Sequence, residues 1–223
     1  MTSSSLLVDR FAMAAEQAGC VVWRVAGPHE LPAMLDAWVS PDRGPVPSDA
    51  PGLVSASGRT TVVLDEVPVT ARPPEAVVVT ADTPVEQITD AQLAVVAPLA
   101  AVAETGSLVL LETERFRRLV SLFGRTLVAV VPTSLVVPSL DDVAVMLDRL
   151  PPALPFHLTL VTGPSRTADI ERRLTIGVQG ATEVVVVLLD DGADDRAAPM
   201  PAGTATGAGP AIGADTVTTG GSP

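Results

Sequence analysis

The sequence predicts an α/β domain of three layers, in which helices cover both faces of a mostly parallel sheet. Short runs rich in valine recur along the chain. They are continuous rather than alternating, as in strands that are buried on both faces. Segments with a helical spacing of apolar residues lie between several of these runs, the order typical of an α/β fold. With 223 residues, 47% of them hydrophobic, the chain is long enough for one sizeable core.

The first elements follow from apolar spacing and from glycine. Residues 5–19 predict a helix, because Leu6, Phe11, Ala14 and Ala18 recur at about helical spacing and Gly19 can end it. Residues 20–25 predict a short strand and residues 30–39 a second helix. Residues 40–58 are rich in Pro, Gly, Ser and Asp, which predicts a mobile loop.

The rest of the domain is a series of strands with helices between some of them. The predicted strands are Thr61–Val67, Ala76–Thr80, Leu93–Ala97, Ser107–Glu112, Thr126–Val131, His157–Val161 and Val184–Leu189. Residues 114–123 and 139–150 predict helices, the latter with Ser139 as N-cap and two aspartates in its first turn. Residues 193–223 are mostly Ala, Gly, Pro and Thr, which predicts a disordered tail after a single domain at 1–192.

Composition excludes several kinds of chemistry. All 14 basic residues are arginine, so Schiff-base chemistry and a P-loop lysine are excluded. The single cysteine and the two histidines exclude a disulfide, an iron–sulfur cluster carried by this chain and a multi-histidine metal site. The net charge of −12 opposes nucleic-acid binding. With no signal-like start and no apolar run of about 20 residues, we expect a cytoplasmic protein without a membrane span.

The strongest candidate site is the segment 163–171, Gly-Pro-Ser-Arg-Thr-Ala-Asp-Ile-Glu. An apolar run precedes it, and residues 169–174 have a helical pattern. A strand that ends in a Gly-Pro turn and opens a helix presents free N–H groups and the positive end of the helix dipole, which favour an anion. Arg166 adds a fixed charge that can hold a carboxylate or a phosphate. The alternative is a capped helix in which Arg166 pairs with Asp169 or Glu171 on the surface.

A second candidate is Glu104, followed by Thr105 and Gly106, just before the strand at 108–111. A carboxylate in an apolar neighbourhood can be partly desolvated, which raises its pKa and suits a nucleophile or a base. The alternative is a strand-entry turn whose glutamate faces solvent.

Together these segments resemble the lactate-utilisation protein C family, whose domain is the LUD domain. The resemblance is carried by GPSRTADIE with the following LTIGVQGATEVVVVLLDD, by AVAETGSLVLLE at 101–112, and by the strand–turn–helix pattern of residues 126–147. It covers roughly residues 11–190. The family usually has a Leu-Pro-Pro-like run with a histidine before the strand at 126, and this chain has Ser-Leu-Phe-Gly-Arg at 121–125 instead.

The resemblance implies a fold and a role. The fold would be the three-layer type of ribose-5-phosphate isomerase, glucosamine-6-phosphate deaminase and CoA transferases. The role would be in oxidising L-lactate to pyruvate, together with iron–sulfur partner proteins and a small anionic ligand. The positions that carry the motifs are Glu104, Thr105, Gly106, Gly163, Ser165, Arg166, Thr167, Asp169 and Glu171.

Roles for these residues remain hypotheses at the level of the sequence. In the leading one, Glu104 and Asp169 are the catalytic candidates, and Thr105, Gly106, Gly163, Ser165, Arg166, Thr167 and Glu171 bind the ligand. Two alternatives stay open: a free-standing CoA-transferase-like enzyme with Glu104 as nucleophile, and a purely scaffolding subunit. The cofactor stays unassigned, because the chain has no GxGxxG fingerprint.

Overall fold

The computed structural model describes residues 3–39, 61–64, 67, 76–151, 157–169, 173–176 and 180–191. The predicted loop at 40–58 and the predicted tail at 193–223 lie outside these residues. Side chains of residues 36–39, 167–169 and 173–176 are also outside the description.

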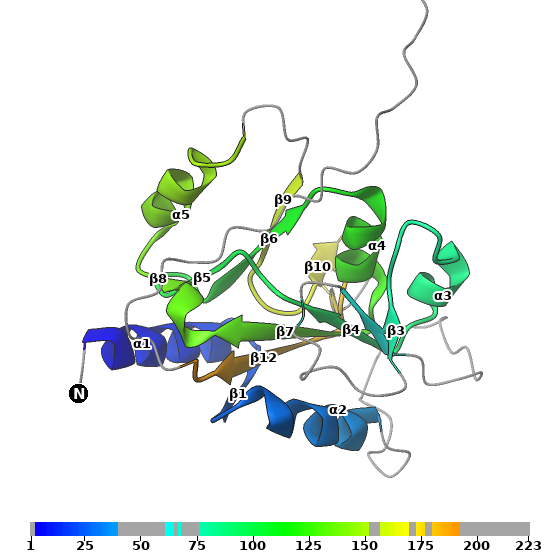
Figure 1. Ribbon diagram of the computed structural model, residues 1–223, viewed down its shortest axis with the longest axis horizontal. Coiled ribbons are helices and arrows are strands. Elements are labelled where there is room, and N and C mark those ends of the chain that lie inside the picture. The colour runs from blue at the N-terminus through cyan, green and yellow to red at the C-terminus, as the bar shows by residue number, and fades with distance from the viewer. Residues whose placement is uncertain are drawn as a thin grey trace, which may run out of the picture.

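A six-stranded parallel sheet forms the centre of the fold, as the valine-rich runs predict (Figure 1). In spatial order it contains β1 (Val21–Val25), β12 (Glu183–Leu189), β7 (Thr126–Pro132), β4 (Leu93–Val96), β2 (Thr61–Val63) and β3 (Val77–Val78). Successive side chains point to opposite faces, so even-numbered Val184 and Val186 pack in one core cluster and odd-numbered Val185 and Val187 in another. The runs are continuous because both faces are covered.

The face of the sheet that a helix covers depends on the direction in which its connection crosses the sheet. The faces are covered by α1 (Ser3–Gln17), α2 (Leu31–Val39), α3 (Val85–Thr89) and α4 (Arg115–Phe123). The connection from β1 out to β2 runs through α2, whose Leu31 and Leu35 pack on one face. The connections that return toward β1 place Ile88 of α3 and Val120 of α4 on the other face, with α1. Crossovers between parallel strands are right-handed, so connections that cross the sheet in opposite directions place their helices on opposite faces.

A second sheet lies on the face that carries α1, and the sequence pattern did not separate it from the first. Its four strands are β8 (Val136–Val137), β5 (Ala100–Val102), β6 (Ser107–Glu112) and β9 (His157–Val161). The helix α5 (Leu140–Leu147) covers its outer face, and lies farthest from α2 in Figure 1. The predicted strands at 107–112 and 157–161 are confirmed, but they do not join the parallel sheet: β6 pairs with β5 and β9 in antiparallel fashion.

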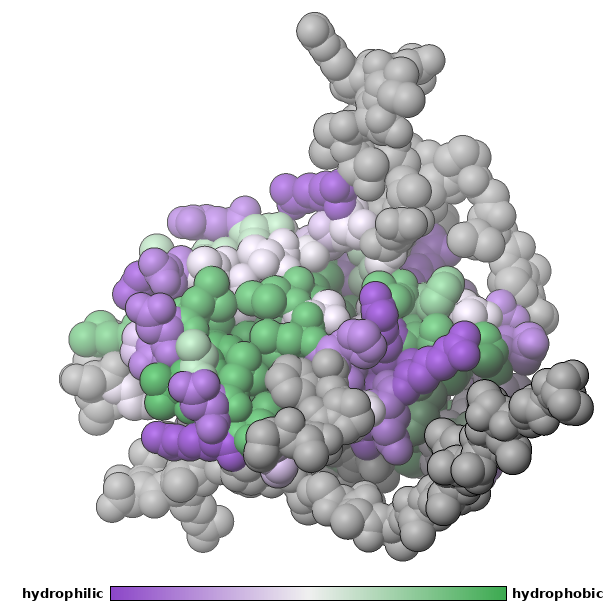
Figure 2. Space-filling model, turned by 90° about the horizontal axis from the view of Figure 1, so that it is seen from above, coloured by the Kyte–Doolittle hydropathy of each residue, from purple (hydrophilic) through white to green (hydrophobic). Residues whose placement is uncertain are grey.

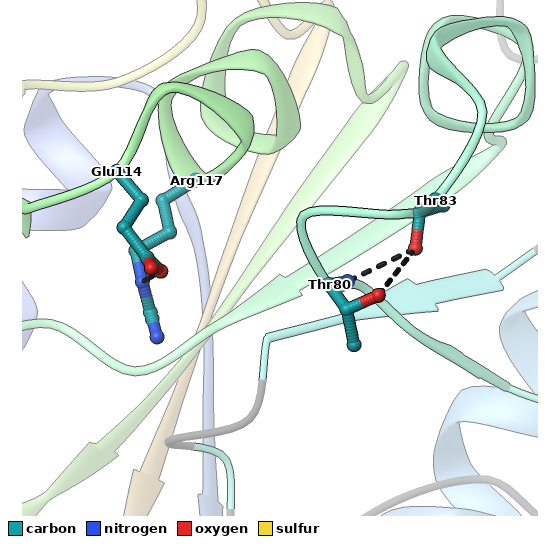
Figure 3. Close-up of polar contacts among 4 residues, drawn as sticks. All are labelled: Thr80, Thr83, Glu114 and Arg117. Atoms are coloured by element: carbon teal, nitrogen blue, oxygen red, sulfur yellow. Dashed lines mark hydrogen bonds and ion pairs between the residues drawn. The ribbon is translucent and has the colours of Figure 1, made fainter. Parts of the chain in front are cut away.

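The structure confirms the helix cap that was predicted at Ser139 and shows side-chain hydrogen bonds near the starts of two other helices. At α5 the backbone N–H and the hydroxyl of Ser139 both donate to Asp142 Oδ2, at 2.9 and 2.7 Å, so the predicted N-cap is confirmed. In the turn before α3, Thr80 N–H donates to Thr83 Oγ1 at 2.9 Å (Figure 3). At the start of α4, Arg117 Nε donates to Glu114 Oε2 at 3.1 Å. The capping box of α5 contributes about 1 kcal/mol, whereas the contact of Arg117 with Glu114 is an ion pair and not a cap.

Apolar side chains also reach the surface on the side of α5. Figure 2 views the molecule from above, and apolar residues gather in the middle of that face. Leu140 and Val145 of α5 and Leu160 of β9 are exposed by 44%, 53% and 47%. They continue the third core cluster, which α5 forms with the outer face of the four-stranded sheet.

Candidate functional site

The first motif forms the turn between β5 and β6. Gly106 has a φ of +68° and donates its N–H to Val102 O at 2.9 Å. This closes the turn and leaves Glu104 and Thr105 exposed. Of the two interpretations of Glu104, the structure agrees with the strand-entry turn whose glutamate faces solvent, because the turn carries this carboxylate away from the apolar residues on either side.

The second motif does not open a helix. Residues 166–169 form β10 (Arg166–Asp169), which pairs with β11 (Arg173–Ile176) as an antiparallel hairpin, with Arg166 opposite Ile176. The predicted helix at 169–174 is wrong. Polar residues alternate with β-branched or apolar ones here, the two-residue period typical of a strand. Pairing between the two strands provides partners for the hydrogen-bonding groups of the backbone. The segment consequently lacks the free helix N–H groups on which the anion site was predicted.

Both motifs pack against the carboxyl-terminal half of α1. A Cβ added at Gly106 would lie 2.4 Å from the backbone of Ala14 and Ala15. A Cβ added at Gly163, whose φ is +83°, would lie 2.2 Å from Ala18 O. Only glycine allows this close approach at positive φ. The two turns thus contact neighbouring parts of one helix and its end.

A chain of three hydroxyl groups joins the two turns. Thr105 Oγ1 shares a hydrogen bond of 2.7 Å with Ser107 Oγ, and Ser107 Oγ shares another of 2.7 Å with Thr162 Oγ1. Ser107 is buried, whereas the two threonines at the ends of the chain are exposed. Thr162 and Ser107 were not among the predicted site residues. The pairing of β6 with β9, which brings Leu108 opposite Val161, places them together.

Arg166 lies at the carboxyl end of α1. It is exposed, and its Nη2 donates to Ala18 O at 3.2 Å. This carbonyl belongs to the end of α1, where the helix dipole is negative, so the guanidinium stabilises the helix terminus. One bond to Ala18 uses one of the five guanidinium donors. The alternative pairing of Arg166 with Asp169 or Glu171 stays untested, because both carboxylates lie outside the described side chains.

The remaining predicted residues divide between described and undescribed ones. Ser165 donates its N–H to Ala181 O at 3.0 Å, which fixes the turn to the segment before β12. Thr167 and Asp169 are placed on β10 by their backbone only, and Glu171 lies outside the described residues. Their roles remain predictions.

Cys20 lies beneath the second motif as a buried thiol. Burial raises its pKa from the ordinary 9.0 to about 11, against the opposing effects of a hydrogen bond from the Gly163 backbone and of the Arg166 charge. The neutral thiol is therefore the form that the folded state favours. A buried thiol with a raised pKa is expected to be structural rather than reactive.

This shift predicts a loss of stability at alkaline pH. The pKa of Cys20 is higher in the folded state than in the unfolded one. The contribution of its neutral thiol to the free energy of unfolding is therefore fully present below about pH 9 and is lost as the pH rises toward 11. Two pKa units correspond to about 2–3 kcal/mol. The chain has no lysine and no tyrosine, so few other groups titrate in this window. Urea unfolding at pH 8 and pH 11 should show the loss in the native protein and little of it in Cys20→Ala; an equal loss in both would contradict the assignment.

Neither a metal site nor a membrane helix is found in the described part of the chain. No group of three or more His, Cys, Asp and Glu side chains there could hold a metal ion. Across the same residues, no helix has the length and apolar character that crossing a bilayer requires.

Known proteins resemble this chain in both sequence and fold. A family model described as the LUD domain matches residues 8–189. Lactate utilization protein C of Macrococcus caseolyticus is 36% identical over 92 residues, which are 40% of each chain. The Bacillus subtilis protein of that name is 34% identical over 92 residues, 40% of this chain and 38% of its own length. The match thus spans about two fifths of these curated relatives.

A solved structure agrees with the fold. The crystal structure of a DUF162 family protein from Deinococcus radiodurans matches with a TM-score of 0.57 and 16% identity, over 85% of this chain and 99% of that one. At this identity the match supports a shared fold alone. The family model, by contrast, covers most of the sequence and contains both motif turns, and on this ground the chain belongs to the LUD domain family.

Proposed function

We propose that this protein is a subunit of an L-lactate utilisation system that acts with iron–sulfur partner proteins and binds a small carboxylate or phosphate. The ligand site would be the motif surface, defined as Glu104, Thr105, Thr162, Ser165 and Arg166. The names of the curated relatives support the metabolic role. The absence of a cysteine set in the sequence is compatible with clusters on partner chains.

The observation that carries the proposal is the hydroxyl chain between the two turns. Thr105 and Thr162 are 57 residues apart, yet Ser107 connects their hydroxyls through two bonds of 2.7 Å. Arg166 follows Thr162 by four residues and is exposed. Two hydroxyls, a guanidinium and the Glu104 carboxylate thereby project from adjacent turns, a combination suited to a 2-hydroxy acid.

The proposed binding mode assigns one task to each side chain. Arg166 holds the carboxylate through donors not used by Ala18 O. Thr105 and Thr162 donate to it or to the hydroxyl. Glu104 accepts the hydroxyl proton as a base, with Asp169 as the second catalytic candidate. Oxidation of lactate to pyruvate removes two electrons and two protons. Glu104 takes the hydroxyl proton, and in this proposal the acceptor of the two electrons and of the hydrogen on C2 belongs to the partner proteins.

Replacing Arg166 tests the site. Arg166→Gln should weaken the binding of lactate, pyruvate or inorganic phosphate, whichever the native protein binds, at least tenfold, since a charged hydrogen bond contributes about 1.5–3 kcal/mol. Calorimetric titration measures this. Arg24→Gln, which removes an exposed arginine on β1, is the matched control and should bind as the native protein does. Equal affinity in the native protein and Arg166→Gln would contradict the motif surface.

The finer fold relationship and its chemistry stay a separate proposal. If the chain shares the ribose-5-phosphate isomerase, glucosamine-6-phosphate deaminase and CoA transferase-like fold, Glu104 could act as an acyl-transfer nucleophile. Its exposure does not favour this reading. A thioester on Glu104 found by mass spectrometry under turnover with a CoA donor would reverse the preference. The scaffolding alternative requires that Glu104 and Arg166 variants both still support growth on lactate.

A further inference from the structure

A hollow of about 450 Å³ lies at the end of α1 opposite to the motif surface. Five polar residues line it: Ser4, Ser5, Arg24, Thr133 and Asp190. Its volume lies within the range of small-molecule sites. Nothing in the predicted motifs points to it, because its residues come from four separate places in the chain.

The hollow occupies the carboxyl edge of the parallel sheet. Thr133 follows β7, Asp190 follows β12 and Arg24 is the penultimate residue of β1, and these three strands are neighbours. Ligands of open α/β sheets bind beyond this edge. Ser4 and Ala18 are 14 residues apart along α1 and its end, so the hollow and the motif surface are separated by about 20 Å.

Hydrogen bonds fix the rim of the hollow. Asp191 accepts from Thr133 Oγ1 at 2.9 Å and from the backbone and hydroxyl of Ser134, so the turn after β7 is attached to the end of β12. Asp190 N–H donates to Val25 O at 3.0 Å. A rim held in this way loses little conformational entropy when a ligand binds.

The charges of the hollow disfavour a simple anion. Arg24 donates to Asp9 Oδ1 at 2.6 Å, so its charge is already compensated. Asp190 contributes a second acidic group, a carboxylate in the lining of the hollow. Hydroxyl groups of a ligand, by contrast, can accept from Arg24 and donate to Asp190. The hydroxyl of Thr133 donates its proton to Asp191, so it can only accept from a ligand, whereas the hydroxyl of Ser4 can donate or accept.

We propose that this hollow binds a neutral polyhydroxylated molecule of sugar or polyol type. Its hydroxyls would exchange hydrogen bonds with Arg24, Asp190 and Thr133. Its carbon skeleton would lie on an apolar floor formed by Val8, Val25 and Leu188. This site is independent of the proposed lactate function, because it shares no residue with the motif surface.

Methyl NMR on the full chain tests the inference with D-ribose as the probe. The methyl signals of Val8, Val25 and Leu188 should shift and saturate as ribose is raised to about 100 mM, a range that covers millimolar dissociation constants. Arg24→Gln should weaken this binding about tenfold, as expected for loss of a charged donor. Ser4→Leu should abolish it by filling the hollow, and leucine is a good helix former.

Arg166→Gln is the control at the other end of α1 and should bind ribose as the native protein does. The inference is overturned if ribose gives no saturable shift at these methyl groups, or if the shifts survive in Ser4→Leu. It is also overturned if lactate produces the same shifts with equal or higher affinity, since the hollow would then be an anion site. Loss of lactate binding in Arg166→Gln with ribose shifts unchanged would support both proposals separately.

Discussion

Gly163→Ala and Gly106→Ala should each lower the free energy of unfolding by about 3–4 kcal/mol. Both glycines have positive φ, which costs an alanine about 1–2 kcal/mol. The added Cβ would also lie 2.2–2.4 Å from the backbone of α1, and overpacking of this kind costs about 1–3 kcal/mol. The helix backbone cannot rotate out of the way as a side chain can. Each loss is a large share of the roughly 5–15 kcal/mol that stabilises a typical domain.

Urea unfolding followed by circular dichroism measures the effect, and the melting temperature should fall by roughly 6–16 °C. Gly27→Ala is the matched control. Its Cβ would also be crowded, at 2.7 Å, but by the ring of His29, an exposed side chain that can move. That variant should stay within about 0.5 kcal/mol of the native protein. Unfolding midpoints of Gly106→Ala and Gly163→Ala equal to that of Gly27→Ala would mean that the turns do not pack on α1 as described.

Glu112→Ala should cost about 3 kcal/mol. Glu112 is the last residue of β6 and is only 3% exposed. It accepts a hydrogen bond from Ser121 of α4 and another, of 2.8 Å, from Thr159 of β9. Removing the carboxylate leaves both hydroxyls without this acceptor and opens a cavity where a helix and two strands meet. No sequence motif marks this residue, since a glutamate at a strand end ordinarily indicates solvent.

Glu112→Gln distinguishes the energetic cost of weakened hydrogen bonds from the cost of the cavity. Glutamine keeps the volume and one carbonyl oxygen, so we expect a loss of about 1 kcal/mol. The order of unfolding midpoints should therefore be native, Gln, then Ala. If Glu112→Ala unfolds at the native midpoint, the carboxylate does not connect α4 with the second sheet.

Local pattern predicted most of the elements of this fold. The valine-rich runs at 93–97, 126–131 and 184–189 became strands of the central sheet, because residues of β4, β7 and β12 are buried on both faces. The helices at 5–19, 30–39, 114–123 and 139–150 were found within a few residues of α1, α2, α4 and α5. The hairpin of β10 and β11 was missed, because short segments with charged residues resemble helices when their pairing partner is unknown.

The candidate site could be found only in part from sequence. Its two motifs were recognisable as separate segments of the sequence. Their contact with α1, and the link through Ser107 and Thr162, depend on the pairing of β6 with β9, which local sequence does not encode. The helix N-terminus predicted at 169 is absent, and Arg166 lies instead at the carboxyl end of α1, where its charge compensates a negative helix end. An anion bound at Arg166 would therefore depend on the guanidinium alone, without a helix dipole.

By itself, the sequence determined the α/β class, the position of the strands of the central sheet and the family to which the chain belongs. Periodicity and composition are properties of neighbouring residues, so they can be read along the chain. Only the tertiary structure decided that the valine-rich runs divide into two sheets, that both motifs meet on α1, and that a polar hollow forms at its other end. These features arise where segments distant in sequence pack together, and their energies come from contacts that no single segment contains.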